Sequence, residues 1–290
     1  MPSSVLLPLM KAVDTVGKEI DWPTVDFVTD RNNLRKLLRW ASGSTGRSND
    51  FRIDFELAGE NTVLFNRFEE RTKVMTDGKG YGFSFEHETT SPTPGCERST
   101  AHHRIVKYDF FGLKMIVRFE VDAFLPSDEA VQSSGKSATT LDSLTDSLST
   151  LQVTTESASP PGLQIIRAGS EVPHRSVIEL KTSSKKHIRW SDIFPQLYLS
   201  QTPWFYVGFH EKGTFTEVQK SNMLEMKEQR KDLEGRLRQL GQTLEMIQEL
   251  AIAHGTKKCL SLVCQSGVLT VYERVGIEQC PVGDQQENEC

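Results

Sequence analysis

No apolar run in this chain of 290 residues approaches the length of about 20 residues that a helix needs to span a bilayer. The apolar stretch at residues 5–10 is too short for a secretory signal, and no basic segment precedes it. The five cysteines are odd in number and form no CxxC pair, which argues against a disulfide framework or a zinc site. We therefore expect an intracellular protein of the nucleus or cytoplasm, with reduced thiols and no membrane partner.

Positive charge is not in excess either. The formal net charge is −5 at pH 7, so the composition does not by itself indicate a nucleic-acid partner. An enzyme that acts on nucleic acid can still be acidic overall, because carboxylates that hold a metal ion lower the total charge. The sequence also lacks a DDxxD motif, which excludes an isoprenoid synthase.

The predicted elements follow the order of an α/β (α+β) domain. A helix begins at about Asp30, where leucines recur at helical spacing with Arg31, Arg35 and Arg39 between them. The other predicted elements are strands at 51–57, 62–68, 113–122, 177–182, 204–209, 259–264 and 268–274, and helices at 193–200 and 221–253. These elements predict a single domain with one mixed, twisted sheet and flanking helices.

Two of the predicted strands carry charged residues two positions apart. Glu120 and Asp122 lie on the first strand, whose other face is apolar, and Glu179 and Lys181 lie on the second. Side chains alternate between the faces of a strand, so the two members of each pair point the same way. Hard divalent cations prefer carboxylate oxygens, and a lysine balances charge on a phosphate. Together the two pairs would suit metal-dependent cleavage of a phosphate ester or anhydride.

Each pair taken alone is more typical of a solvated strand face. Their conjunction favours a site, because apolar neighbours such as Phe119 and Leu180 place both pairs on core-forming strands. Gln196 lies on the predicted helix that follows the second pair. An acidic-x-Lys strand followed by a helix that carries glutamine resembles the arrangement of PD-(D/E)XK nuclease-like proteins.

Residues 127–162 are rich in serine and threonine and carry only scattered apolar residues. Such a composition buries too little surface to offset the entropy of ordering, so we predict a disordered segment. The two charged strands flank it and would need each other, which makes it an insertion within one domain. We therefore expect an N-terminal extension at 1–27, a domain at 28–280 and a C-terminal tail at 281–290.

Five segments, taken in order, resemble the DXO family of mRNA decapping enzymes and 5′-end quality-control exoribonucleases. Residues 82–86, Gly-Phe-Ser-Phe-Glu, are similar to the family's Gly-Tyr-x-Phe-Glu segment, with Phe83 in place of tyrosine. Residues 178–183, Ile-Glu-Leu-Lys-Thr-Ser, are similar to its Glu-Leu-Lys-Thr-Ser strand. The other matching segments are 29–38, 119–122 and 203–209.

This resemblance implies a site for two divalent ions, Mg²⁺ or Mn²⁺. The implied metal ligands are the carboxylates of four residues and one main-chain carbonyl: Glu86, Glu120, Asp122, Glu179 and Leu180. Two ions about 4 Å apart activate a water and stabilise the leaving oxygen of an in-line displacement. Four acidic groups placed together would also repel one another strongly without cations between them. Without the resemblance, Glu86 would be interpreted as an ordinary exposed acid.

The resemblance also implies residues that contact the substrate. Lys181 and Gln196 would contact the scissile phosphate or the attacking water, and Arg31 would bind the RNA 5′ end or its backbone. For Arg31 the alternative is one more basic residue on an amphipathic helix. The expected catalytic set therefore combines Lys181 and Gln196 with Asp122 and Glu179.

The implied fold is a PD-(D/E)XK nuclease-like core. The implied function is a metal-dependent hydrolase that removes incomplete or NAD-containing 5′ caps from RNA, acting as a pyrophosphohydrolase or deNADding enzyme in mRNA quality control. A 5′-to-3′ exoribonuclease activity and an exoribonuclease partner stay open. Two alternatives remain: a non-catalytic protein that stimulates such an exoribonuclease, and a DNA-directed nuclease of the wider PD-(D/E)XK group.

Overall fold

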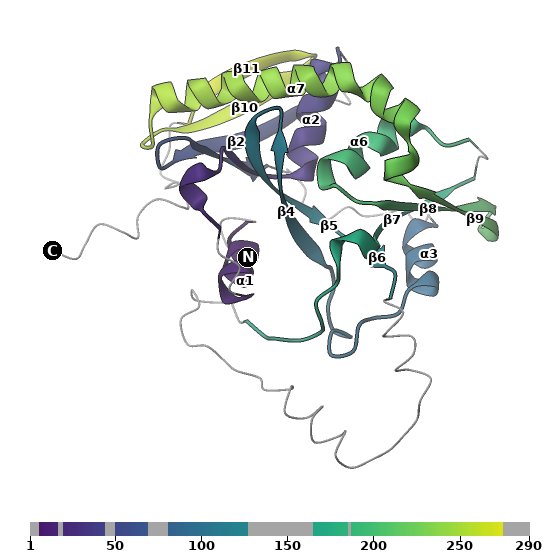
Figure 1. Cartoon of the computed structure of the whole chain (residues 1–290). Coiled ribbons are helices and arrows are strands. Elements are labelled where there is room, and N and C mark those ends of the chain that lie inside the picture. The colour runs from purple at the N-terminus through teal and green to yellow at the C-terminus, as the bar shows by residue number, and fades with distance from the viewer. Residues whose placement is uncertain are drawn as a thin grey trace.

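The strands of this protein fall into two sheets, with helices packed on and between them (Figure 1). The computed structural model describes residues 6–16, 20–43, 50–68, 81–126, 165–184 and 187–274. The insertion predicted at 127–162 and the tail predicted at 281–290 lie outside these described residues. Within the described ranges, no helix is both long and apolar enough to cross a membrane.

The elements have the following bounds. The larger sheet contains β1 (Phe27–Asp30), β2 (Phe51–Ala58), β3 (Thr62–Arg67), β4 (His103–Phe110), β5 (Leu113–Glu120), β10 (Cys259–Gln265) and β11 (Val268–Glu273). The smaller sheet contains β6 (Ala123–Phe124), β7 (Val177–Ser183), β8 (Trp204–Glu211) and β9 (Thr214–Asn222). The helices are α1 (Leu7–Val16), α2 (Arg31–Ala41), α3 (Gly82–Thr89), α6 (Trp190–Ser200) and α7 (Lys227–His254). Short 3-10 turns are η1 (Trp22–Thr24), η3 (His174–Ser176) and η4 (Met223–Glu225).

Both sheets are mixed, which confirms the predicted fold class, although the sequence predicted one sheet and the structure has two. In the larger sheet the order is β11-β10-β2-β3-β1-β5-β4, and β1 pairs in parallel with β3 and with β5. In the smaller sheet the order is β6-β7-β8-β9, and only β7 and β8 are parallel. The chain crosses between the sheets at Val121 and Asp122, which separate β5 from β6.

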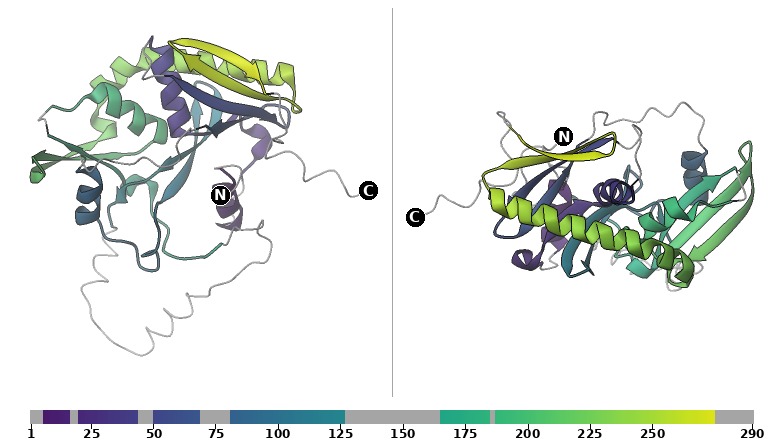
Figure 2. Two further views of the ribbon diagram at one scale, coloured as in Figure 1. Left: turned by 180° about the vertical axis from the view of Figure 1, so that it is seen from behind. Right: turned by 90° about the horizontal axis from the view of Figure 1, so that it is seen from above.

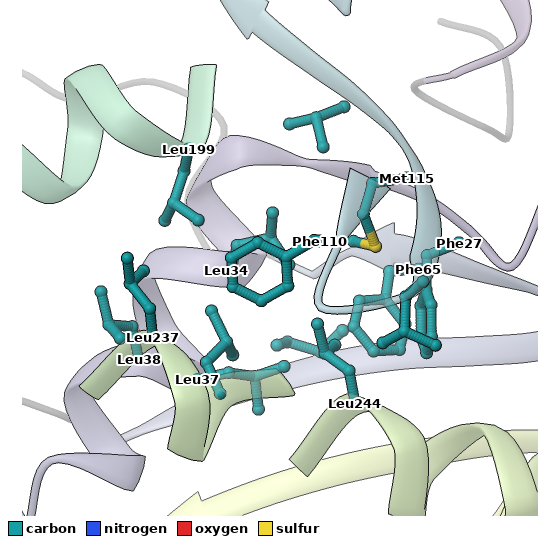
Figure 3. Packing of buried hydrophobic residues seen from close by; sticks show 14 of the residues in the cluster. Phe27, Leu34, Leu37, Leu38, Phe65, Phe110, Met115, Leu199, Leu237 and Leu244 are labelled. Atoms are coloured by element: carbon teal, nitrogen blue, oxygen red, sulfur yellow. The ribbon is translucent and has the colours of Figure 1, made fainter. Parts of the chain in front are cut away.

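The main core lies between the larger sheet and helices α2, α6 and α7. Leucines spaced three and four apart on α2 and α7 meet aromatic side chains of the strands, including Phe27 and Phe65 (Figure 3). Helix α7 runs from the smaller sheet across the larger one (Figure 2). Its repeating leucines are therefore buried against the sheet and α2, as predicted, and form no coiled coil. A second cluster, which includes Val28, Leu64 and Ile116, packs beneath Leu6 and α1 on the other face.

The face of β5 that carries Glu120 is buried in its middle, and only Lys114 and Glu120, near the two ends of the strand, are exposed. Arg118 is buried in an ion pair, in which its Nε donates to Asp30 Oδ1 at 2.5 Å. The strand also ends at Glu120, two residues earlier than predicted. Asp122 therefore follows the strand and does not share a strand face with Glu120.

Several elements were not recognised in the sequence. The polar segment Thr214–Asn222 pairs with β8 as strand β9, so the long helix begins at Lys227 and not near Ser221. Strands β1 and β4 were missed as well; β1 is only four residues long. The short central strand β1 is buried on both faces, and the edge strand β9 is polar, so neither shows the alternation that marks a half-buried strand. Pairing with neighbouring strands decides their conformation.

One cysteine departs from the expected chemistry. Cys96 and Cys264 are free, as predicted, whereas Cys259 is disulfide-bonded. The prediction of reduced thiols is therefore wrong for Cys259, because the spacing of cysteines along a sequence does not report which of them approach one another in space.

Candidate active site

Three of the four charged residues singled out from the two strands, Asp122, Glu179 and Lys181, meet where the sheets adjoin. Glu120 is exposed at the end of β5 and joins them only through its repulsion of Glu86. Strand β6 pairs with β7 through Ala123 and Ile178, which places the preceding Asp122 beside β7. Asp122 Oδ2 accepts a hydrogen bond from the Leu180 main-chain N–H at 2.7 Å. A carboxylate from the end of one sheet is thereby fixed against the backbone of the other sheet.

Glu179 is the centre of this group and is only 2% exposed. Its Oε1 accepts from Lys181 Nζ at 2.5 Å, and its Oε2 accepts from Arg31 Nη1 at 2.7 Å. Lys181 Nζ also donates to the Leu180 carbonyl oxygen at 3.0 Å and lies 3.6 Å from Asp122 Oδ2. The prediction that Glu179 and Lys181 share a face is confirmed by this contact.

The positive side chains of Arg31 and Lys181 together offset the free-energy cost of burying the ionised Glu179 carboxylate. Burial by itself would raise the pKa of this carboxyl group, but attraction from Arg31 and Lys181 is stronger in sum and holds the pKa below its usual value. Burial would likewise lower the pKa of Lys181, yet the carboxylates of Glu179 and Asp122 raise it. Glu179 is thus ionised and Lys181 is protonated at neutral pH.

Two other carboxyl groups of the site, those of Asp122 and Glu86, have raised pKa values. Burial, and then repulsion from Glu179, raises the pKa of Asp122 to about 6. Burial, and then repulsion from Glu120, raises the pKa of Glu86 above its usual value. Burial is the larger cause of both shifts, and the smaller, repulsive part arises because Asp122 lies near Glu179 and Glu86 lies near Glu120.

Arg31 lies at the cluster and is not simply one of several basic residues along a helix. It is the first residue of α2, and its Nη1 lies 3.4 Å from Ser200 Oγ as well as beside Glu179. Its guanidinium carbon lies 5.8 Å from the centre of the Phe119 ring. Ser200 and Phe119 were not identified from the sequence as parts of the site, since neither residue type marks a site at these positions.

Gln196 is buried on α6, one turn before Ser200. Its Nε2 donates to the Asp192 carbonyl oxygen within the same helix at 3.1 Å. Among the described residues, no hydrogen bond joins Gln196 to Glu179, Lys181 or Asp122. The structure therefore places the expected glutamine on the correct helix, with its amide bonded within that helix and not to the carboxylate cluster.

Glu86 reaches the cluster because α3 docks on the smaller sheet. The helix is anchored by the buried Phe85, whose ring centre lies 4.7 Å from that of Phe215. Phe85 packs directly over Gly208 of β8, where an added Cβ would lie 2.6 Å from the ring. An isolated glycine inside a strand marks a close approach of this kind, and this signal was present in the sequence but was not used.

Replacing Gly208 with alanine should push Phe85 outward and carry Glu86 away from the cluster. Overpacking of this kind costs about 1–3 kcal/mol of stability. If Glu86 is a ligand, the affinity for Mn²⁺ measured by calorimetry should also fall, by about tenfold. The matched control is Gly235→Ala on α7, where an added Cβ meets nothing within 4 Å and should stabilise the helix by about 0.5–1 kcal/mol. Lower stability with unchanged Mn²⁺ affinity would remove Glu86 from the ligand set.

The sequence of this chain matches one model of a protein family. A family model described as a domain of unknown function, DUF8563, matches residues 1–285. The chain belongs to this family. A comparison of the sequence with curated proteins finds no match.

The DUF8563 chain has the fold of several solved structures. Rai1 of S. pombe in complex with 3′-FADP is 17% identical, with a TM-score of 0.63, and the match covers 94% of this chain and 78% of that one. Rai1 of Candida albicans in complex with pU5-Mn²⁺ is 13% identical, with a TM-score of 0.58 and coverages of 93% and 74%. Dxo1 of K. lactis in complex with manganese is 11% identical, with a TM-score of 0.58 and coverages of 96% and 73%. These are DXO family structures, so the likeness predicted from the sequence motifs is confirmed at the level of the fold.

The chemistry of this DUF8563 cluster suits a hard divalent cation, because its donors are carboxylate oxygens and a main-chain carbonyl. In the described part of the chain, no three acidic, histidine or cysteine side chains are yet close enough to hold one ion together. Both oxygens of Glu179 are instead engaged by Lys181 and Arg31. A metal ion would therefore compete with these two cationic side chains for the same carboxylate.

Proposed function

We propose that this protein is a metal-dependent hydrolase of RNA 5′ ends, which removes incomplete or NAD-containing caps. The observation that carries the proposal is the buried Glu179, held between Arg31 and Lys181 and next to Asp122, at the junction of the two sheets. Support comes from the shared fold, since Rai1 of S. pombe was solved with 3′-FADP and Rai1 of Candida albicans with pU5-Mn²⁺. A 5′-to-3′ exoribonuclease activity is part of the same proposal.

The proposed metal ligands are the same five groups expected from the sequence: Glu86, Glu120, Asp122, Glu179 and the Leu180 carbonyl oxygen. Mg²⁺ or Mn²⁺ fits this donor set, and when bound the ions supply an activated water and stabilise the developing negative charge. The Leu180 N–H keeps Asp122 oriented, and burial excludes water from Glu179.

The proposed substrate contacts come from three further side chains. Lys181 and Arg31 are positive and adjacent to Glu179, so each would be placed to donate to a phosphate oxygen of the substrate. Gln196 is proposed to orient the attacking water, which requires its amide to release the Asp192 carbonyl oxygen. Their combined role is to position the phosphate and stabilise its charge.

A substrate panel tests the proposal against its alternatives. The full chain is incubated with 5′-triphosphate, 5′-monophosphate, cap-analogue and NAD-capped RNA and with DNA of the same sequence, in Mn²⁺ or in EDTA. Release of the 5′ group from RNA in Mn²⁺ but not in EDTA is the expected result. Cleavage of DNA alone would favour a DNA-directed nuclease. No cleavage combined with no Mn²⁺ binding in calorimetry would favour a non-catalytic protein that stimulates an exoribonuclease.

A further inference from the structure

A cavity of about 1060 Å³ with positively charged residues in its wall lies near the carboxylate cluster. Three arginines from two helices line it: Arg35 and Arg39 from α2, and Arg236 from α7. None of the proposed metal ligands lines this cavity. We call it the arginine cavity, and its charge has no role in the proposed hydrolysis.

In the described part of the chain, neither Arg35 nor Arg39 forms a hydrogen bond or an ion pair, whereas Arg236 Nε donates to Ser42 Oγ at 2.7 Å. Burial, and then repulsion from Arg39 and Arg31, lowers the pKa of Arg35 to about 10. Attraction from Glu179 and Asp192 offsets this repulsion only in part, so the excess of positive charge favours the binding of an anion.

Negative charge in the cavity is limited to one side chain among its described lining residues. Asp192 of α6 lines the cavity and already pairs with Arg189, whose Nε lies 3.4 Å from Asp192 Oδ2. Ser191, in the first turn of α6, also faces the cavity, and no side chain caps this end of the helix. The first turn of a helix carries partial positive charge, which adds to that of the arginines.

The spacing of the arginines along α2 suits a ligand with several phosphates. Arg31, Arg35 and Arg39 are four residues apart, so successive side chains lie about 6 Å apart along one face of the helix. The first of them contacts Glu179 in the carboxylate cluster, and the last lines the arginine cavity. Arginine is suited to phosphate oxygens because its planar fork donates two hydrogen bonds at once.

We propose that the arginine cavity is a second phosphate-binding site, separate from the carboxylate cluster. Its ligand chemistry is that of phosphate oxygens, supplied by the backbone of an RNA strand or by a free oligophosphate. Arg39 and Arg236 hold the anion from opposite helices, and Arg35 contributes charge from the buried side. Binding at this site does not depend on hydrolysis at Glu179.

The test is a calorimetric titration of the full chain with inorganic tripolyphosphate, in EDTA and at low salt. The variant is Arg39→Gln with Arg236→Gln, and the control is Arg230→Gln with Arg238→Gln, which removes the same charge from exposed positions on α7. We expect wild type and control to bind alike and the variant to bind about 100-fold more weakly, since each lost charge-assisted contact is worth about tenfold or more.

A second arm of the test uses a 5′-phosphorylated oligonucleotide of ten nucleotides in the same buffer. Weaker binding of both probes would support a site for phosphate oxygens from either source. Weaker binding of the oligonucleotide alone would identify an RNA backbone, and weaker binding of tripolyphosphate alone would identify a free oligophosphate. If neither probe binds the arginine variant more weakly than the control, the arginine cavity is not a phosphate site. Because EDTA prevents metal-dependent hydrolysis, this result is independent of the proposed function.

Discussion

Replacing Glu179 with glutamine is expected to lower the rate of RNA 5′-end hydrolysis by about a thousandfold or more. Glu179 is the most deeply buried carboxylate of the cluster and the one that two cationic side chains contact. Stabilisation by bound metal ions supplies several kcal/mol to such reactions, and about 4 kcal/mol corresponds to a thousandfold in rate. Glutamine keeps the size of the side chain and removes the charge that a metal ion needs.

The same substitution should also weaken the fold. It breaks a buried ion pair and leaves Arg31 and Lys181 facing an amide, a change that costs about 3–5 kcal/mol in comparable sites. Rates must therefore be measured well below the midpoint temperature of unfolding, which circular dichroism measures for each variant. Asp122→Asn gives a milder second variant, because asparagine can still accept the Leu180 N–H.

The matched control for both variants is Glu56→Gln. Glu56 is also buried, but it lies on β2 of the larger sheet and accepts a hydrogen bond from Asn66 at 3.4 Å. The hydrolysis rate of this variant should stay within about twofold of the wild-type rate, since Glu56 shares no partner with the carboxylate cluster among the described residues. Wild-type rates in both Glu179→Gln and Asp122→Asn would show that the cluster is not the active site.

Replacing Lys181 with glutamine is expected to separate metal binding from turnover. The rate at saturating Mn²⁺ should fall by about 100- to 1000-fold, the usual effect of removing one group that stabilises transition-state charge. Affinity for Mn²⁺ should stay the same or rise, because Lys181 Nζ now occupies oxygens of Glu179 and Asp122 that a metal ion would use. Steady-state kinetics and calorimetry with Mn²⁺ measure the two effects.

Lys107→Gln is the control for this substitution, since Lys107 is exposed on β4 and the change in charge is the same. It should change neither the rate nor the affinity for Mn²⁺. If Lys181→Gln lowered the rate and the Mn²⁺ affinity together, Lys181 would be a structural support for the carboxylates and would not contact the substrate.

The contrast between Gln196 and Asp122 shows where sequence reasoning was sufficient for the site and where it was not. A local motif placed Gln196 on α6, but the side-chain contact with Asp192 could not be read from spacing. The sequence pattern placed Asp122 on the same strand face as Glu120, but β5 ends at Glu120, so Asp122 lies beyond the strand. It reaches the cluster nevertheless, since the two-residue strand β6 pairs with β7 and carries it there.

Periodicity in the sequence determined the long helices, most core strands and the shared face of Glu179 and Lys181. These features depend on neighbours within a few residues, where 3.6- and two-residue repeats report burial directly. Tertiary structure alone decided that the strands divide into two sheets and that Arg31 meets Glu179 across 148 residues of sequence. It also decided that Phe85 over Gly208 brings Glu86 to the same place. Such contacts arise from the packing of whole elements, and no local pattern encodes which residues that packing will bring together.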